Sequence, residues 1–226
     1  MKYYLDSAKL DEIDYAYRAF KIDGVTTNPK HIMNSGKPFL TAIQDIANWI
    51  KENHLEGKDV FPVSVEINPH LSKAEEMVEQ GKKISSMCEN FVIKIPCNEE
   101  GCKAALQLEQ LGVRTNVTLV FSIAQAIQAG RIGAMFVSPF VGWKESAGED
   151  GLEYIKKITN IYRVKGYETQ IIAAAIRTGT QIAECAEADV DIVTAGLDVY
   201  KATLVDPWTD LGLKKFCDAW DHTKGN

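Results

Sequence analysis

One lysine stands in the apolar segment 91–96, FVIKIP, where every neighbouring side chain is hydrophobic. Burial among such neighbours disfavours an ammonium ion, so we expect it to lower the pKa of Lys94 and to favour the neutral amine. A neutral amine attacks carbonyl groups to form a Schiff base, and the protonated imine withdraws electrons from a neighbouring carbon–carbon bond. The structural alternative is that Lys94 reaches into solvent or only pairs with Glu66.

Two carboxylates suit this chemistry. Imine formation moves protons on and off the carbinolamine oxygen, and cleavage of the carbon–carbon bond needs a base for the hydroxyl of the released carbon. Asp6 and Glu66 lie in different strand-like segments, so both can approach one small molecule from different sides. For Asp6 the competing interpretation is a charged rim or a helix N-cap, because Ser7 and a helix-like segment follow it.

Further polar residues stand at the ends of strand-like segments. Asn28, Asn116 and Thr118 are suited to holding substrate hydroxyls or a relay water. The segment 26–29, TTNP, is equally compatible with a turn that only closes a strand. The remaining polar candidates at these ends are Thr27, Ser138 and Arg177.

Short segments rich in β-branched residues alternate with amphipathic helical segments, one of which spans 72–88. Eight such units in about 200 residues favour a closed (β/α)8 TIM barrel over an open doubly wound sheet, with its functional groups at the carboxyl ends of the strands. No G-x-G-x-x-G motif follows any of these strands, which disfavours dinucleotide binding. The predicted strands are 2–6, 24–28, 62–67, 91–96, 115–120, 134–140, 169–175 and 191–195.

The chain of 226 residues, 46% hydrophobic and 25% charged, contains no low-complexity linker, so we expect residues 1–226 to form a single domain. After the barrel, residues 207–210 (PWTD) predict a turn and an N-cap, followed by an additional C-terminal helix at about 209–222. Leu213, Phe216 and Trp220 lie along this helix. We expect it to pack on a neighbouring subunit, although the same residues are compatible with packing on its own barrel.

Composition excludes several classes of partner. The net charge of −6 disfavours a nucleic acid or an anionic membrane as partner. The five cysteines are scattered without a C-x-x-C motif and the four histidines are far apart, which predicts reduced thiols and no metal site. No signal-peptide segment and no run of about 18 apolar residues is present, so we expect a cytoplasmic protein.

These motifs together resemble the short transaldolase and fructose-6-phosphate aldolase family, from the first strand to the last helix. The resemblance implies a (β/α)8 barrel that forms a Schiff base without a metal or an organic cofactor and assembles as a homopentamer or decamer. It implies that Lys94 forms the imine and that Asp6 is the acid/base for cleavage. Glu66 with Thr118 would hold a catalytic water, and Asn28 with Asn116 would bind the dihydroxyacetone portion. The motifs are Asp6, 24–29 (GVTTNP), 92–96 (VIKIP), 116–122 (NVTLVFS), 138–142 (SPFVG) and 206–210 (DPWTD).

Within this family the aldolase branch has a tyrosine at the position of Phe140 and a glutamine at that of Glu66, so the chain resembles the transaldolase branch. A phenyl ring cannot pass a proton to the enamine as a phenol can, so the enamine should survive until an aldehyde acceptor arrives. Two alternatives remain. One is a lyase that releases free dihydroxyacetone, and the other is a non-catalytic barrel in which Lys94 and Arg177 only hold an anionic sugar.

The chain departs from the family where members hold the phosphate of the substrate. Members have arginine, serine, and arginine or lysine at three positions that here are Trp143, Ala175 and Arg177. A phosphate dianion would lose two of three partners there, whereas a single cation suits a monoanionic sulfonate. We therefore expect 6-deoxy-6-sulfofructose as donor, with glyceraldehyde 3-phosphate or erythrose 4-phosphate as acceptor. Fructose 6-phosphate remains an equal alternative if Lys30, Lys144 or helix N-terminal amides replace the missing contacts.

Overall fold

Eight parallel strands pair in chain order and close into a barrel. The structure is a computed structural model that describes residues 1–223. The strands are β1 (Lys2–Asp6), β2 (Gly24–Thr26), β3 (Val63–Glu66), β4 (Phe91–Pro96), β5 (Thr115–Val120), β6 (Phe136–Pro139), β7 (Gln170–Ile176) and β8 (Ile192–Ala195). Strand β1 pairs with both β2 and β8, which closes the ring. The predicted (β/α)8 barrel is confirmed.

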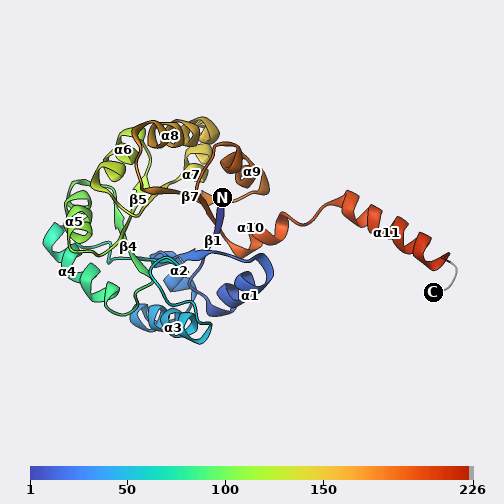
Figure 1. Ribbon diagram of the computed structural model, residues 1–226, viewed down its shortest axis with the longest axis horizontal. Helices are drawn as coiled ribbons and strands as arrows, with labels where there is room; N and C mark the ends of the chain where they lie inside the picture. Colours follow the sequence, from blue (N-terminus) through green and yellow to red (C-terminus); the bar gives the residue numbers. More distant parts are fainter. Residues whose placement is uncertain (224–226) are drawn as a thin grey trace.

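Helices surround the ring of strands (Figure 1). In the described residues they are α1 (Leu10–Phe20), α2 (Pro29–Asn34), α3 (Phe39–Glu52), α4 (Ala74–Ser85), α5 (Glu99–Gln110), α6 (Ile123–Ile132), α7 (Val141–Ser146), α8 (Gly151–Lys165), α9 (Gly179–Glu187), α10 (Leu197–Ala202) and α11 (Pro207–Asp221). The short helices α2 and α7 begin directly after β2 and β6 and were not predicted. They add backbone and side chains at the carboxyl ends of these strands.

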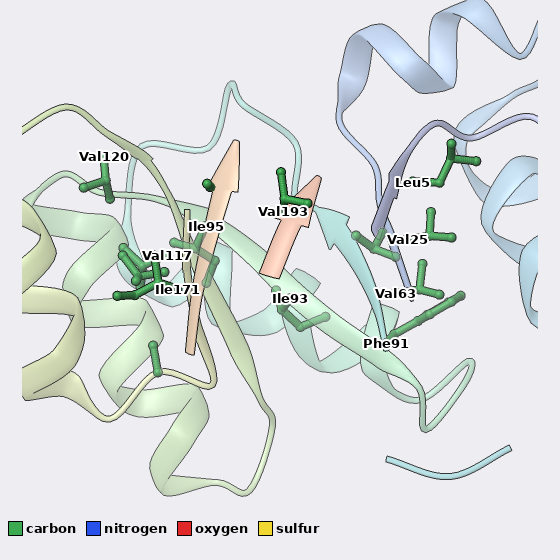
Figure 2. Close-up of a cluster of buried hydrophobic side chains, with 14 of the residues drawn as sticks. Leu5, Val25, Val63, Phe91, Ile93, Ile95, Val117, Val120, Ile171 and Val193 are labelled. Atoms are coloured by element: carbon green, nitrogen blue, oxygen red, sulfur yellow. The ribbon is translucent and has the colours of Figure 1, made fainter. Parts of the chain in front are cut away.

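Side chains on the outer face of the strands pack against the helices. Leu5, Val25, Val63, Ile93 and Val193 belong to this layer and are completely buried. Figure 2 shows these side chains on neighbouring strands of the barrel. Burial of such branched apolar side chains contributes about 1.5–3 kcal/mol each to folding. This layer fixes the strands, and with them the residues that alternate to the barrel interior.

The interior of the barrel changes from apolar to polar along the strands. Tyr4, Val92, Phe136, Ile172 and Ile192 form a separate buried cluster. Because side chains on one face of a strand recur every second residue, the next inward positions lie two residues further on. Those positions are occupied on β1, β4, β6 and β8 by Asp6, Lys94, Ser138 and Thr194. The apolar cluster therefore supports a polar layer at the carboxyl ends.

Some predicted boundaries are wrong. Strand β2 ends at Thr26 rather than at residue 28, because Asn28 is the N-cap of α2 and Pro29 is its first residue. The last helix begins at Pro207 rather than at about 209. Proline at the first helical position needs no donor partner, and the side chain of Asp206 accepts a hydrogen bond from the Trp208 amide.

Helix α11 extends away from the barrel and is joined to it through α10 (Figure 1). None of its described residues is buried, so the alternative in which this helix packs on its own barrel is not what the structure adopts. Among the described residues, no helix combines the length and apolar character needed to cross a membrane.

Candidate active site

The polar layer contains a buried ion pair. The side chain of Lys94 is only 5% exposed, and its Nζ lies 3.7 Å from Glu66 Oε2. The two residues are register partners on β3 and β4, and Lys94 Nζ also donates a hydrogen bond to the carbonyl of Thr27 at 3.2 Å. Lys94 therefore does not reach into solvent. It faces a carboxylate inside the barrel mouth.

Asp6 stands at the end of β1 with a hydrogen-bond donor on each carboxylate oxygen. Thr26 Oγ1 donates to Oδ1 at 2.9 Å, and His31 Nε2 lies 3.1 Å from Oδ2. The N-cap interpretation of Asp6 is wrong, because α1 begins later and its N-cap is Lys9. The carboxylate of Asp6 belongs to the barrel mouth.

The environments of the two carboxyl groups shift their pKa values in opposite directions. For Asp6, burial opposes the charged form, but the hydrogen bond and charge of His31, together with Lys94 and Thr26, hold its pKa below the ordinary value. For Glu66, burial raises the pKa and the charge of Asp6 adds to this, while Lys94 opposes it. Two carboxyl groups whose pKa values are shifted apart in this way suit different roles as acid and base.

A hydrogen-bonded chain crosses the interior beside Lys94. Asn116 Nδ2 donates to Ser64 Oγ at 2.9 Å, and Ser138 Oγ donates to Asn116 Oδ1 at 2.7 Å. Thr118 lies two residues along β5 from Asn116, and its hydroxyl is buried with no hydrogen-bond partner in the described residues. A buried hydroxyl without a partner costs about 1–3 kcal/mol, which marks Thr118 as available to a ligand.

Thr27 and Asn28 have structural as well as candidate binding roles. The hydroxyl of Thr27 donates to the Ser64 carbonyl at 2.9 Å, and Asn28 Oδ1 accepts a hydrogen bond from the His31 amide at 2.9 Å. The expected turn at 26–29 therefore forms and starts α2. Both residues also border a cavity of about 310 Å³, lined among others by Glu66, Ile32, Phe39 and Ile67.

Three aromatic rings gather where β5 and β6 end. The ring centroids of Phe121, Phe140 and Trp143 are 5.3 to 5.6 Å apart, and Trp143 is 52% exposed. Phe140 pairs through its backbone with Ala174 on β7. These rings form an apolar wall on the β6–β7 side of the barrel.

The expected anion-binding residues lie next to this wall. Arg177 Nη1 donates to Ser146 Oγ on α7 at 3.0 Å, so its exposed guanidinium lies beside the helix that carries Trp143. Ala175 has a φ of 60°, and its carbonyl oxygen lies against Gly142 of α7. The structure thus brings Arg177 and Ala175 to α7, and Arg177 is the single cation among Trp143, Ala175 and Arg177.

Sequence reasoning missed the residues that support the candidate acid and base. Thr26 and Ser64 occupy inward positions of β2 and β3, which the strand period already indicated. His31 was considered only as a metal ligand. Its position three residues after the N-cap Asn28 is the signal that places it near the barrel mouth. No group of three or more His, Cys, Asp and Glu side chains in residues 1–223 is arranged to hold a metal ion.

Comparison with known proteins identifies the family. The sequence profile of the Transaldolase/Fructose-6-phosphate aldolase family matches residues 3–225. The chain belongs to this family. A 6-deoxy-6-sulfo-D-fructose transaldolase of Priestia megaterium is 58% identical over 223 residues, which cover 99% of this chain and 96% of the relative. A protein of the same name from Priestia aryabhattai matches equally, and a probable transaldolase of Dictyoglomus turgidum is 40% identical over 98% of both chains.

Membership of the transaldolase/aldolase family confirms the resemblance expected from the motifs. The matched region includes β1 from Tyr3 onward, all of β2 to β8, and α11. Trp143, Ala175 and Arg177, at which we expect the anion of the substrate to bind, all lie inside the matched region.

Proposed function

We propose that the protein is a Schiff-base transaldolase that transfers a dihydroxyacetone unit from an anionic ketose to an aldehyde. The observation that carries the proposal is the buried Lys94, whose Nζ lies 3.7 Å from Glu66 Oε2 in a barrel mouth that also contains Asp6. This arrangement supplies a nucleophilic amine, a carboxyl group with a raised pKa and an ionised carboxylate.

The reaction begins at Lys94. The ammonium passes a proton to Glu66, and the neutral amine attacks the C2 carbonyl of the ketose to form a carbinolamine. Glu66 and Thr118 hold the water that returns a proton to the carbinolamine oxygen, which leaves as water and gives the protonated imine. Burial raises the pKa of Glu66 above its ordinary value, which favours uptake of this proton by its carboxylate.

Asp6 acts as the base in carbon–carbon cleavage. Its ionised carboxylate accepts the proton of the C4 hydroxyl, the C3–C4 bond breaks, and the bonding electrons move into the imine to give an enamine. The shortened aldehyde leaves and an acceptor aldehyde takes its place. The enamine attacks the acceptor, Asp6 returns the proton to the new hydroxyl, and hydrolysis frees the product from Lys94.

The dihydroxyacetone unit is held by side chains from β5 and from the segment after β2, two strands that are not adjacent in the barrel. Asn116, bridged to Ser64 and Ser138, presents a fixed amide, and Asn28 and Thr27 border the cavity on the β2 side. The phenyl ring of Phe140 has no acidic O–H group, so it cannot protonate the enamine before the acceptor binds. This favours transfer over a lyase that releases dihydroxyacetone.

We propose 6-deoxy-6-sulfofructose as the donor, with glyceraldehyde 3-phosphate or erythrose 4-phosphate as acceptor. The single guanidinium of Arg177 beside the aromatic wall of Trp143 suits a monoanion better than a dianion. The Priestia proteins of 58% identity, named 6-deoxy-6-sulfo-D-fructose transaldolases, support the same donor. Fructose 6-phosphate is the competing donor.

The test compares the two ketoses with and without an acceptor aldehyde. We expect kcat/KM at least about tenfold higher for the sulfonate, and product formation that depends on the acceptor. Borohydride added with dihydroxyacetone should leave a covalent adduct on Lys94, which an anion-binding barrel without catalysis cannot produce. Preference for the phosphate would refute the donor, and dihydroxyacetone release without acceptor would favour the lyase.

We further propose that residues 1–226 form one domain and that α11 packs on a neighbouring subunit of a homo-oligomer, a pentamer or a decamer. Support comes from the exposure of Trp208, Leu213 and Phe216, which are 78%, 57% and 74% exposed in the single chain.

All five cysteines are free thiols, a state that the reducing cytoplasm maintains, so we propose a cytoplasmic location.

A further inference from the structure

His31 is attached to the barrel mouth at two points. Its backbone amide donates to Asn28 Oδ1 at 2.9 Å, and its imidazole Nε2 lies 3.1 Å from Asp6 Oδ2. The side chains of His31 and Asp6 are 23% and 22% exposed, so the contact is largely shielded from solvent. A contact held at both backbone and side chain keeps its geometry with little loss of side-chain entropy.

The contact with His31 gives the Asp6 carboxylate its second hydrogen-bond donor. Thr26 Oγ1 donates to Oδ1, and this hydroxyl lies 2.6 Å from Thr194 Oγ1, so the Thr26 side is supported from β8. His31 supplies the donor on Oδ2 from the opposite side. Donors on both oxygens fix the plane of the carboxylate, while each oxygen keeps lone-pair capacity to accept a proton.

We propose that His31 is a positioning residue that holds Asp6 in the orientation and the ionised form in which it accepts the C4 hydroxyl proton. This inference rests on the proposed function, since it assigns a partner to the base of that reaction. The imidazole acts through Asp6 and needs a proton only on Nε2, so the neutral tautomer is sufficient. A side-chain amide that reaches the same oxygen should therefore replace it.

Other charged groups near Asp6 act on its carboxylate through their charge, without a hydrogen bond. Lys94 and Glu66 face it from β4 and β3 with opposite charges. A neighbouring cavity of about 370 Å³, which Asp6 and His31 both line, is also lined by Lys9 and Glu12, the N-cap and a residue of α1, and by Asp198 and Lys201 of α10. Lys9 is paired with Glu12 at 3.1 Å, so it is already compensated. His31 on α2 thus contacts the Asp6 carboxylate itself.

The experiment compares His31→Leu with His31→Gln in the complete protein, with His70→Leu as control. His70 is an exposed histidine in the loop after β3. Removal of the donor should raise the pKa of Asp6, so less of the base is ionised and the acidic limb of the kcat/KM profile should move up by about one pH unit. His31→Leu should lose at least about tenfold in kcat near neutral pH, because the Asp6 carboxylate is no longer held in place, while His31→Gln restores a donor on Oδ2 and should recover most of this activity, and His70→Leu should match the wild type.

Imine formation separates this inference from the proposed function. Borohydride trapping of dihydroxyacetone on Lys94 needs no C4 hydroxyl, so His31→Leu should retain the adduct, and its melting temperature should confirm folding. A wild-type acidic limb in His31→Leu, or a His31→Gln variant as impaired as His31→Leu, overturns the role of His31. If the wild-type protein forms no adduct and cleaves no ketose, the proposed function itself fails, which is a different result.

Discussion

The buried pair of Lys94 and Glu66 is tolerated because a proton can pass from the ammonium to the carboxylate, which leaves both groups neutral. Removing one partner of a buried ion pair usually costs about 3–5 kcal/mol, since the other charge is left uncompensated. Burial already raises the pKa of Glu66, so this group takes up a proton when its cation is lost. The raised pKa that suits Glu66 to the proposed proton transfer therefore also limits the destabilisation when Lys94 is replaced.

Lys94→Met should abolish turnover while the barrel remains folded. The thioether is similar in length to the lysine side chain, cannot form an imine, and leaves a Glu66 that is free to be protonated. We expect at least about a 10⁴-fold loss of kcat and no borohydride adduct by mass spectrometry. Lys82→Met, which replaces an exposed lysine of α4, is the control. An adduct in Lys94→Met would assign the imine to another amine.

Thr118→Val should separate stability from activity. Valine has the shape of threonine without the unpartnered hydroxyl, so the melting temperature should be unchanged or higher. If the hydroxyl holds the catalytic water with Glu66, kcat should fall about 10²-fold. Thr169→Val is the matched control, because Thr169 also has a buried hydroxyl without a partner in the described residues. Equal activity of both variants would remove Thr118 from the mechanism.

The double variant Trp143→Arg with Ala175→Ser should shift the donor preference towards fructose 6-phosphate. It introduces an arginine and a serine, two phosphate-binding side chains, at the two positions expected to lie beside Arg177 in the anion site. We expect the ratio of kcat/KM for the phosphate over the sulfonate to rise about tenfold or more. Arg177→Gln should weaken both donors through KM. An unchanged ratio in the double variant would place the anion elsewhere.

At the scale of elements, two irregular strands shape the candidate anion site. The register shifts between Val117 and Val120 of β5 and between Ala173 and Ile176 of β7. Each shift contains a non-glycine residue in the left-handed region, Leu119 with φ 56° and Ala175 with φ 60°. Such backbone costs about 1–3 kcal/mol and persists where the surroundings enforce it. The bulge in β7 brings the Ala175 carbonyl against α7.

Gly142→Ala should disturb α7 more than its small size suggests. A Cβ at this position would clash with the carbonyl oxygen of Ala175, and neither backbone can yield easily. We expect a loss of about 1–3 kcal/mol in unfolding free energy and a raised KM for the anionic ketose, because Trp143 and the Ser146 contact to Arg177 move with the helix. Gly212→Ala on α11, where nothing lies near the added Cβ, should not destabilise.

The bounds of β1, β4 and β5 agree with those predicted, because short runs of aromatic residues (β1) or β-branched residues (β4 and β5) bounded by polar segments carry a strong strand signal. The candidate lysine and carboxylates were also predictable, since polar side chains in apolar strands are rare. Helix α2, with six residues, is too short for a helical period to be recognised. The left-handed backbone at Ala175 and the contact of His31 with Asp6 depend on tertiary packing, which no local pattern records.

The whole molecule consists of a closed barrel and a helix that leaves it. Trp208, Phe216 and Trp220 stand eight and four residues apart along α11, so they share one side of the helix. Aromatic side chains bury about 150–250 Å² each when they are covered, and exposure of several on one helix disfavours an isolated chain in water. We propose that a second copy of the chain buries these side chains, because in a symmetric assembly each copy packs its own α11 on a neighbour and is contacted by the α11 of another copy.

Trp208→Glu combined with Phe216→Glu should convert the oligomer into monomers. The two side chains are 78% and 74% exposed in the single chain, so the barrel itself does not depend on them. Light scattering should give a multiple of 25.1 kDa for the wild type and this mass for the variant, with an unchanged circular dichroism spectrum. Lys214→Gln on the same helix should leave the assembly intact. A monomeric wild type, or a variant that still assembles, would contradict the role assigned to α11.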